Sequence, residues 1–408
     1  MAYGLGITLR QPSPVTVEYA AADGPRLSLE LPATRTHVAR LARLRPGRTY
    51  EWTIAGTTHT GSFETKPLPA DLADVRFTAN GAPTVPLVLV HLFRPDGFRG
   101  YAIVDAQGEV VWYFRTVDTS FGMTRRADGS FVFLDRLRGL VEVAADGRVL
   151  HELPTDTLAR EMHHDAVVTP ANTILFLAFD DRPVDGVPVK GEAIWEWTPE
   201  TGAVVKRWSA WDYLDVRTDR GPRFDREWLH ANALAIGPRG NVLVSLHYLN
   251  QVVSIAPDWS RLEWRLGGVN ATIALPAEAS FSGQHSAREI ATDRVVLFDN
   301  RIEQRDRSRA LELALNGDRA TLHWEWSPAV ANFSAIVSSA RRLGTGNTLV
   351  GFGAARGVAG ATGPTEVFEV SPAGEAVWHL LVENTTIMFR AEPIATVAGE
   401  KHAALRDP

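Results

Sequence analysis

Histidines stand at comparable points of successive strand-like segments, and they are the side chains of this sequence best suited to chemistry. His163 and His164 precede one apolar segment, His230 precedes the next and His285 the one after, while His247 follows the segment that begins after His230. A neutral imidazole is a good nucleophile, base or metal ligand near pH 7. Histidines that converge on one point therefore predict either group transfer or metal chemistry.

The segments that carry these histidines belong to a repeat. A turn with Gly, Asn or Asp, an apolar strand, a second apolar strand, another turn and a late, often Trp-bearing strand recur in this order. Five copies begin at Asp128, Asn172, Gly240, Asp293 and Gly346, and residues 87–113 form a further copy at the start. Short antiparallel strands at such spacing are typical of a β-propeller, and six copies predict six blades.

A propeller explains why distant histidines would meet. The first strand of each blade lines the central axis, so residues just before these strands converge at one mouth. We therefore expect an axial active site around His164, His230 and His285. A single histidine near a strand end is more often structural, whereas several at one mouth favour a functional site. The remaining histidines lack this register and are expected at the surface or in packing: His37, His59, His91, His151, His323, His379 and His402.

The N-terminal residues predict a separate small domain. Apolar and polar residues alternate over 26–31, and a Pro46-Gly47 turn precedes a second alternating stretch with Tyr50. This turn and strand resemble those of fibronectin type III modules. The predicted fold is all-β, with a small N-terminal β-sandwich over 1–67 and a six-bladed β-propeller over 84–400.

Composition narrows the classes of function. The net charge of −6 argues against nucleic-acid binding, and no apolar run approaches the roughly 20 residues of a membrane span. We therefore expect a soluble protein with neither kind of partner. The absence of Cys excludes disulfides and thiol nucleophiles. The N-terminus has no basic or apolar leader, which predicts a cytoplasmic protein as encoded, or an exported one if a leader has been removed.

Several segments, taken in order, resemble the arylsulfotransferase family, the phosphoadenosine-phosphosulfate-independent aryl sulfate sulfotransferases. The match covers roughly residues 160–390. Its motifs are HHDA at 163–166, WLHAN at 228–232, WRLGG at 264–268, FSGQHSAR at 281–288, LFDN at 297–300, GNTL at 346–349 and MFRA at 388–391.

The resemblance implies a reaction and gives each motif a role. His285 would attack the sulfur of an aryl sulfate and carry the sulfuryl group as a sulfohistidine to a phenolic acceptor, without a cofactor. His164 and His230 would bind the sulfate oxygens and assist proton transfer. The small aromatic or phenolic substrate would also meet four further residues: His163, Asn232, Asn250 and Arg288.

His247 departs from the family pattern and opens a second hypothesis. It stands where the family carries a channel Arg, whose guanidinium is always charged and binds a sulfate through two parallel hydrogen bonds. We count His247 among the catalytic residues, with Arg288 or another Arg supplying the missing charge.

Four imidazoles on one axis would also suit one transition-metal ion, such as iron, copper, nickel or zinc. Its ligands would be His164, His230, His247 and His285, with Asp165 orienting His164. A non-catalytic ligand-binding propeller is a third hypothesis. In all three, the insertion at 217–226 is expected to cap the axis.

Overall fold

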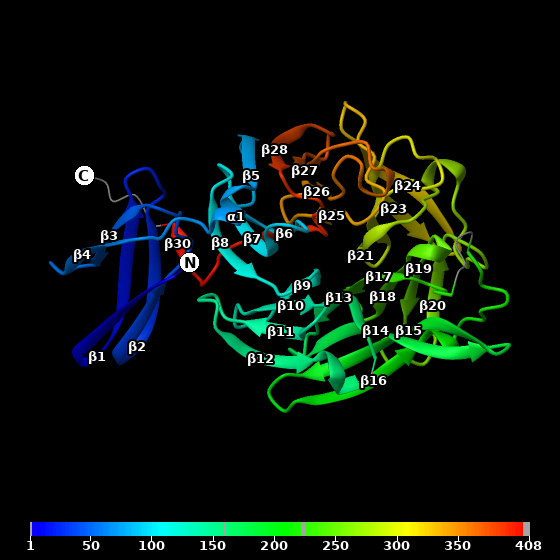
Figure 1. Ribbon diagram of the computed structural model, residues 1–408, viewed down its shortest axis with the longest axis horizontal. Coiled ribbons are helices and arrows are strands. Elements are labelled where there is room, and N and C mark those ends of the chain that lie inside the picture. The colour runs from blue at the N-terminus through cyan, green and yellow to red at the C-terminus, as the bar shows by residue number, and fades with distance from the viewer. Residues whose placement is uncertain (1, 159, 222–225, 403–408) are drawn as a thin grey trace.

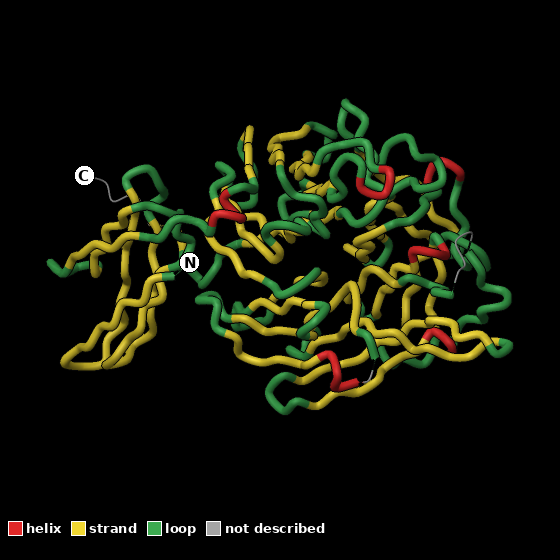
Figure 2. Tube along the Cα trace, viewed as in Figure 1, coloured by secondary structure: helices red, strands yellow, loops and turns green. Residues whose placement is uncertain are grey.

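The computed structural model describes residues 2–158, 160–221 and 226–402, and strands dominate it (Figure 2). The helices are single turns: α1 (Ala70–Ala73) and the 3-10 turns η1 (Thr155–Leu158), η2 (Ala210–Asp212), η3 (His247–Leu249), η4 (Ala277–Ala279) and η5 (Val358–Gly360). The all-β, propeller-like class predicted from the repeat is confirmed.

The N-terminal strands form a lobe beside the propeller (Figure 1). Its one sheet has the order β30-β2-β1-β3-β4, whereas a sandwich would have two sheets. The pairing of β1 with β2 shifts register twice between Thr8 and Val15. Such irregularities bend long strands, and this sheet encloses its own apolar cluster, which includes Val17 and Tyr19. Its strands are β1 (Tyr3–Ala21), β2 (Leu27–Leu41), β3 (Thr49–Ile54), β4 (Thr60–Glu64) and β30 (Lys401–His402).

The other strands of the described chain pair into six antiparallel sheets. The number of blades stays a prediction. Three consecutive sheets, formed by residues 120–266, have four strands each. In each of these sheets the first strand in sequence is the inner one, and the next three follow it outward in order. They are β9 (Ser120–Arg125), β10 (Phe131–Asp135), β11 (Gly139–Val143) and β12 (Val149–Pro154); β13 (Met162–Val168), β14 (Ile174–Val184), β15 (Val187–Thr198) and β16 (Ala203–Ser209); and β17 (Ala231–Ile236), β18 (Val242–Leu246), β19 (Gln251–Ile255) and β20 (Leu262–Leu266).

The last three sheets complete the circle. They are β21 (His285–Ala291), β22 (Arg294–Asp299), β23 (Arg309–Asn316) and β24 (Arg319–Trp326); β25 (Ser339–Arg342), β26 (Thr348–Phe352), β27 (Thr365–Val370), β28 (Ala376–Glu383) and β5 (Arg76–Gly81); and β29 (Ala391–Ile394), β6 (Leu87–Phe93), β7 (Arg99–Asp105) and β8 (Val110–Arg115).

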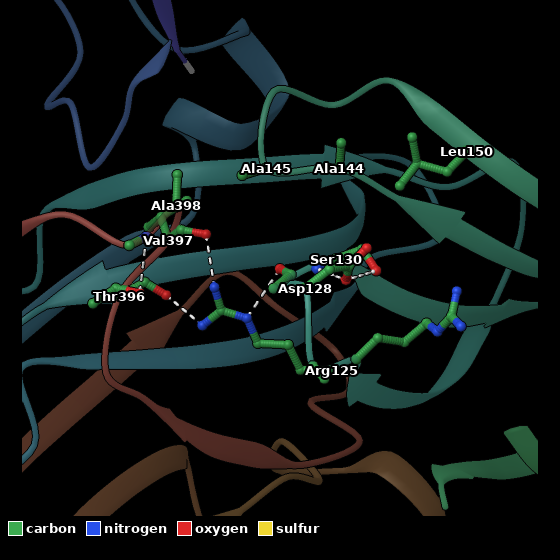
Figure 3. Close-up of a pocket in the computed structure, with 13 residues that line it drawn as sticks. Arg125, Asp128, Ser130, Ala144, Ala145, Leu150, Thr396, Val397 and Ala398 are labelled. Carbon is green, nitrogen blue, oxygen red and sulfur yellow. Dashed lines mark hydrogen bonds between the residues drawn. The ribbon is translucent and has the colours of Figure 1, made fainter. Parts of the chain in front are cut away.

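Both ends of the chain contribute to the closure. Strand β29, near the C-terminus, pairs with β6, and β5 extends the sheet of β28, so a strand that precedes residue 84 belongs to the propeller. After β29 the chain runs past Arg125, whose guanidinium donates to the carbonyl oxygens of Thr396 at 2.5 Å and Val397 at 2.9 Å (Figure 3). This contact directs the chain toward β30 in the N-terminal sheet.

The inner strands surround the axis and carry a shared irregularity near their starts. Gly122, His164, His230 and Ser286 all have φ between 51° and 56°, although three of them are not glycine. In β9, β13 and β21 these residues fall at register shifts, and the shift in β17 lies directly after His230. A left-handed residue at a bulge turns its neighbours' side chains out of simple alternation.

Gly122 also has a packing reason to be glycine. A Cβ there would lie 3.0 Å from the backbone nitrogen of Ala166 on β13 and 3.2 Å from the carbonyl oxygen of His164. The missing side chain therefore lets β9 approach the histidine-bearing start of β13 closely.

Candidate active site

Four histidines lie in an unbroken row where the inner strands begin, which we call the entry end of the propeller. The ring centroids are 4.6 Å apart for His164 and His230, 5.2 Å for His230 and His247, and 5.1 Å for His247 and His285. We call these four residues the histidine row. Backbone hydrogen bonds place His247 opposite His230, since its N–H donates to the carbonyl oxygen of His230 at 3.2 Å.

Aromatic side chains continue the row around the entry end. Phe121 stacks on His164 with centroids 5.3 Å apart and meets Phe389 at 5.1 Å. On the other side, the backbone N–H of Val337 donates to Nε2 of His285 at 3.2 Å, and Ser338 donates to the carbonyl oxygen of Phe389. Imidazoles thus occupy one part of the entry end and phenyl rings another part.

His285 is held in one tautomer by its surroundings. Its Nδ1 lies 2.8 Å from Oδ1 of Asn300 and 3.1 Å from the carbonyl oxygen of Gly283. Two acceptors require a proton on Nδ1, so the lone pair of the neutral ring is on Nε2. Burial lowers the pKa of His285 to about 3, against the opposing hydrogen bond from Asn300 and with support from the charge of His230. The ring is therefore neutral, with an unprotonated Nε2, at pH 7.

A buried carboxylate lies beside His163, which in turn contacts His164. Nε2 of His163 lies 2.8 Å from a carboxylate oxygen of Glu192, and its Nδ1 lies 2.9 Å from Nδ1 of His164. The Nε2 of His163 and this oxygen lie at ion-pair distance without hydrogen-bond geometry, so the geometry of this contact does not fix which ring owns the one proton between the two Nδ1 atoms. Burial and the charges of His230 and His163 hold the pKa of His164 well below its ordinary value.

His230 has a carboxylate partner of its own. Its Nδ1 lies 2.7 Å from Oε1 of Glu227, and its ring stacks on Tyr248 with centroids 4.7 Å apart. Burial raises the pKa of Glu227, but the hydrogen bond and charge of His230 outweigh burial and leave that pKa below its ordinary value. An ionised carboxylate on Nδ1 stabilises the imidazolium that forms whenever Nε2 takes up a proton.

Asp165 has a different partner from the one expected. Its carboxylate forms a buried two-point ion pair with Arg390, at 3.0 and 2.8 Å, and accepts backbone N–H groups from Ala166 and Leu234 at 2.9 Å. The neighbouring His164 turns its Nδ1 to His163 instead. The expectation that Asp165 orients His164 is therefore wrong, because the strand bulge points the two side chains in different directions.

The other residues predicted to bind substrate have structural partners. The amide of Asn232 donates to the carbonyl oxygen of Gln284 at 2.8 Å, directly before His285. Oδ1 of Asn250 accepts the N–H of Gly283 at 2.8 Å and so supports the same loop. Arg288 pairs at 2.6 Å with Glu392 and lies in the wall of a separate cavity, away from the histidine row.

The insertion at 217–226 falls partly outside the described residues, since 222–225 are not placed. Its described part approaches the histidine row at Gly221, where a Cβ would lie only 1.7 Å from the carbonyl oxygen of Tyr248. Nearby, Asp219 receives the indole N–H of Trp228 on its carbonyl oxygen at 2.7 Å. The insertion therefore packs against the residues that flank His230.

Three partners of the histidines were not singled out from the sequence. Glu227 had a detectable signal, since it stands three residues before His230. Asn300 follows β22, whose Phe298 pairs with His285, so a strand-pairing argument would have found it. Glu192, on β15, is remote in sequence from His163, and no local pattern indicates that contact.

Two further findings concern metal binding and membrane spans. Within residues 2–158, 160–221 and 226–402, no three or more His, Asp or Glu side chains are grouped as a metal site would require. Over the same residues, no helix combines the length and apolar character needed to cross a membrane.

Comparison with solved structures gives matches of low sequence identity, of which the first has a TM-score above 0.5. A protein of unknown function from Bacteroides caccae has a TM-score of 0.51 at 16% identity, over 76% of this chain and 100% of that one. A gluconolactonase from Xanthomonas campestris has a TM-score of 0.42 at 12% identity, over 77% and 93%. A quinonprotein alcohol dehydrogenase-like protein from Bacteroides thetaiotaomicron has a TM-score of 0.41 at 10% identity, over 96% and 94%. These likenesses concern the fold alone.

Family comparison is more specific. No curated protein matches the chain. The family model described as Arylsulfotransferase (ASST) matches residues 78–390, which include every inner strand up to the start of β29 and the whole histidine row. The match covers well over half of the 408 residues. This chain belongs to the arylsulfotransferase family.

Proposed function

We propose that this protein transfers a sulfuryl group from an aryl sulfate to a phenol, with His285 as the nucleophile. The observation that carries the proposal is the state of this ring: Asn300 and Gly283 hold the Nδ1 proton, and burial keeps Nε2 unprotonated. In this structure the lone pair on Nε2 accepts the N–H of Val337 at 3.2 Å, so sulfur would take the place of that donor when His285 attacks.

In the first half-reaction, Nε2 of His285 forms a bond to sulfur while the bond from sulfur to the aryl oxygen breaks. The electron pair of the broken bond goes to that oxygen. His230, with Glu227 on its Nδ1 and its ring next to that of His247 in the row, gives the leaving phenolate a proton from Nε2. In the second half-reaction, His230 takes the proton of the acceptor phenol, whose oxygen bonds to sulfur as the bond to His285 breaks.

The entry end also supplies features that an aryl sulfate requires. Phe121 and Phe389 offer phenyl faces beside the imidazoles, where an aromatic ring stacks favourably. We propose that His164 donates the proton shared with His163, so that its own Nε2 is unprotonated and acts as an acceptor. We therefore place His164 beside the hydroxyl of the acceptor phenol, and not on the sulfate oxygens as the resemblance implied.

The decisive experiment combines turnover with trapping. We expect the protein to turn over 4-nitrophenyl sulfate repeatedly only when a phenolic acceptor is present, and to release a single equivalent of nitrophenol per chain when it is absent. Without acceptor, it should gain the mass of one sulfuryl group on His285 in an acid-labile form. His285→Ala should abolish turnover and labelling, while His59→Gln, a change at an exposed histidine of the N-terminal lobe, should retain both. Full transfer by His285→Ala would refute the proposal.

A metal-dependent reaction at the histidine row is the hypothesis that competes with sulfuryl transfer. Carboxylate and amide partners on the far ring nitrogens also occur around metal-bound histidines. Elemental analysis of the purified protein separates the two, because a metalloenzyme would hold close to one transition-metal ion per chain and lose it on any change in the histidine row.

A further inference from the structure

Three arginines surround one carboxylate in the interior, away from the histidine row. Glu392 on β29 lies 2.6 Å from Arg288 on β21, 3.5 Å from Arg341 on β25 and 4.0 Å from Arg390. Arg390 is shared with Asp165. Three guanidinium groups thus meet two carboxylates, which leaves one positive charge in excess.

The hydrogen bonds within this cluster are incomplete. In the part of the chain that the structure describes, the buried Nε atoms of Arg288 and Arg390 have no hydrogen-bond partner. Burial and the neighbouring charge of Arg341 lower the pKa of Arg288 to about 10. Burial raises the pKa of Glu392, but the three arginines outweigh burial and hold that pKa below its ordinary value. Like charges crowd here, and an additional anion would relieve them.

A cavity of about 210 Å³ borders the cluster. Its lining combines the charged residues Arg125, Arg288, Arg341 and Glu392 with apolar residues, among them Leu89, Met123, Phe131, Pro393 and Ile394. An apolar cavity of about 150 Å³ is enough to bind benzene. This cavity therefore has room for a six-membered ring together with a small anionic group.

The cavity lies toward the ends of the inner strands, away from the entry end. Arg125 and Ile394, both in its wall, are the last residues of β9 and β29, whereas Phe121 and Phe389 of the entry end lie at or just before the starts of these strands. The ion pair of Asp165 and Arg390 stands between the cavity and the histidine row.

We propose that this cavity is a second binding site, for a small organic anion that carries a carboxylate or sulfonate group on an apolar ring. The anion would lie against the guanidinium groups of Arg288 and Arg341 and neutralise the excess charge. Its ring would pack against Met123 and Phe131. The site does not depend on sulfuryl transfer at His285, since it shares no residue with the histidine row.

The test uses benzenesulfonate as the probe, with titration calorimetry on the whole protein. The anion should bind to the wild-type protein and equally to His285→Ala. Arg341→Met should weaken binding at least about tenfold, because it removes one of the guanidinium groups that line the cavity. Arg148→Met, a change at an exposed arginine elsewhere, is the matched control and should bind like the wild type. Benzyl alcohol, which has the ring without the charge, should not bind.

A second measurement on the unmodified protein covers the case in which Arg341→Met fails to fold. The sequence has only four methionines, so methyl-labelled methionine gives a simple spectrum. Benzenesulfonate should shift the signal of Met123 and leave that of Met162 unchanged. The proposal is overturned if the probe does not bind, if binding disappears in His285→Ala, or if the Met123 signal does not move.

Discussion

Oδ1 of Asn300 lies 2.8 Å from Nδ1 of His285, and the amide nitrogen of Asn300 donates to the carbonyl oxygens of Ser334 and Val337 at 2.7 and 3.1 Å. Since the nitrogen side of the amide is committed to two acceptors, the oxygen must face the histidine. This arrangement decides which nitrogen of His285 carries the proton, and it leads to the first prediction.

Asn300→Ala should lower kcat for sulfuryl transfer about 10- to 100-fold, which corresponds to the loss of one buried hydrogen bond worth about 1–3 kcal/mol. KM should change little, because Asn300 is behind the ring. Asn316→Ala, at an exposed position, serves as the control. Steady-state rates with 4-nitrophenyl sulfate give kcat and KM for each variant. An unchanged kcat in Asn300→Ala would show that Asn300 does not contribute to catalysis.

Glu227→Gln should impair proton transfer by His230. General acid–base catalysis contributes about 10²- to 10⁴-fold to a rate. The loss of transfer rate should therefore be large for aryl sulfates whose leaving phenol has a high pKa. It should be small for 4-nitrophenol, which leaves readily without a proton. Rates across a series of aryl sulfates measure this dependence. Glu161→Gln, at a more exposed carboxylate, is the control, and an equal loss for all leaving groups would argue against the acid–base role.

On the proposal that His164 donates the proton shared with His163, Glu192→Gln should reverse the proton positions of these two residues. One oxygen of Glu192 accepts the N–H of Ala231 at 2.9 Å, so the Gln oxygen would take that place and its amide nitrogen would face His163. His163 would then carry its proton on Nδ1, and His164 would carry its proton on Nε2. Nitrogen NMR of labelled histidine reads the two tautomers directly, and transfer to acceptor phenols should slow together with the change. Unaltered tautomers of His163 and His164 would show that Glu192 does not determine where their protons lie.

His91 should contribute to acid sensitivity. It is fully buried, its Nδ1 accepts the N–H of Phe389 at 3.0 Å, and burial lowers its pKa to about 3. The folded state keeps this ring neutral, while the unfolded chain takes up a proton below about pH 6.5. The free energy of unfolding should therefore fall as the pH drops from about 6.5 toward 3, by up to about 1.4 kcal/mol per pH unit for this residue.

Urea unfolding at several pH values checks this prediction. His91→Gln removes the titrating group and should make the slope shallower by about one proton. His59→Gln, a change at an exposed histidine of the N-terminal lobe, should leave the slope as it is. A slope unchanged in His91→Gln would show that other groups dominate the acid response.

His247→Arg distinguishes sulfuryl transfer from metal chemistry. The ring of His247 lies between those of His230 and His285, so a guanidinium there would reach the transferring oxygens with two parallel donors. Transfer should rise roughly tenfold, within the range that charge stabilisation supplies. The control is His247→Gln, which has one neutral donor. If the protein instead holds a metal and loses it in His247→Arg, the sulfuryl proposal fails.

The sequence alone determined much of the architecture. The recurring turns and apolar strands are local features, so they predicted the propeller-like class. The repeat placed His164, His230 and His285 before the strands that follow Asn172, Gly240 and Asp293, and those strands are the second ones of their sheets, β14, β18 and β22. The inner strands precede them: His164 lies within β13, His285 begins β21, and His230 stands directly before β17. The family motifs were likewise readable as short segments, from His163 to Arg390.

Other features were decided only by the tertiary structure. Glu192 reaches His163 from another strand, and Arg390 reaches Asp165 across the axis from a distant part of the chain, so no local pattern records either contact. Arg288 follows His285 by three residues, yet a bulge at Ser286 separates their partners. The N-terminal strands pair in one sheet because register shifts bend β1 and β2. Local periodicity predicts which residues face inward, whereas bulges and long-range packing decide which partners their side chains contact.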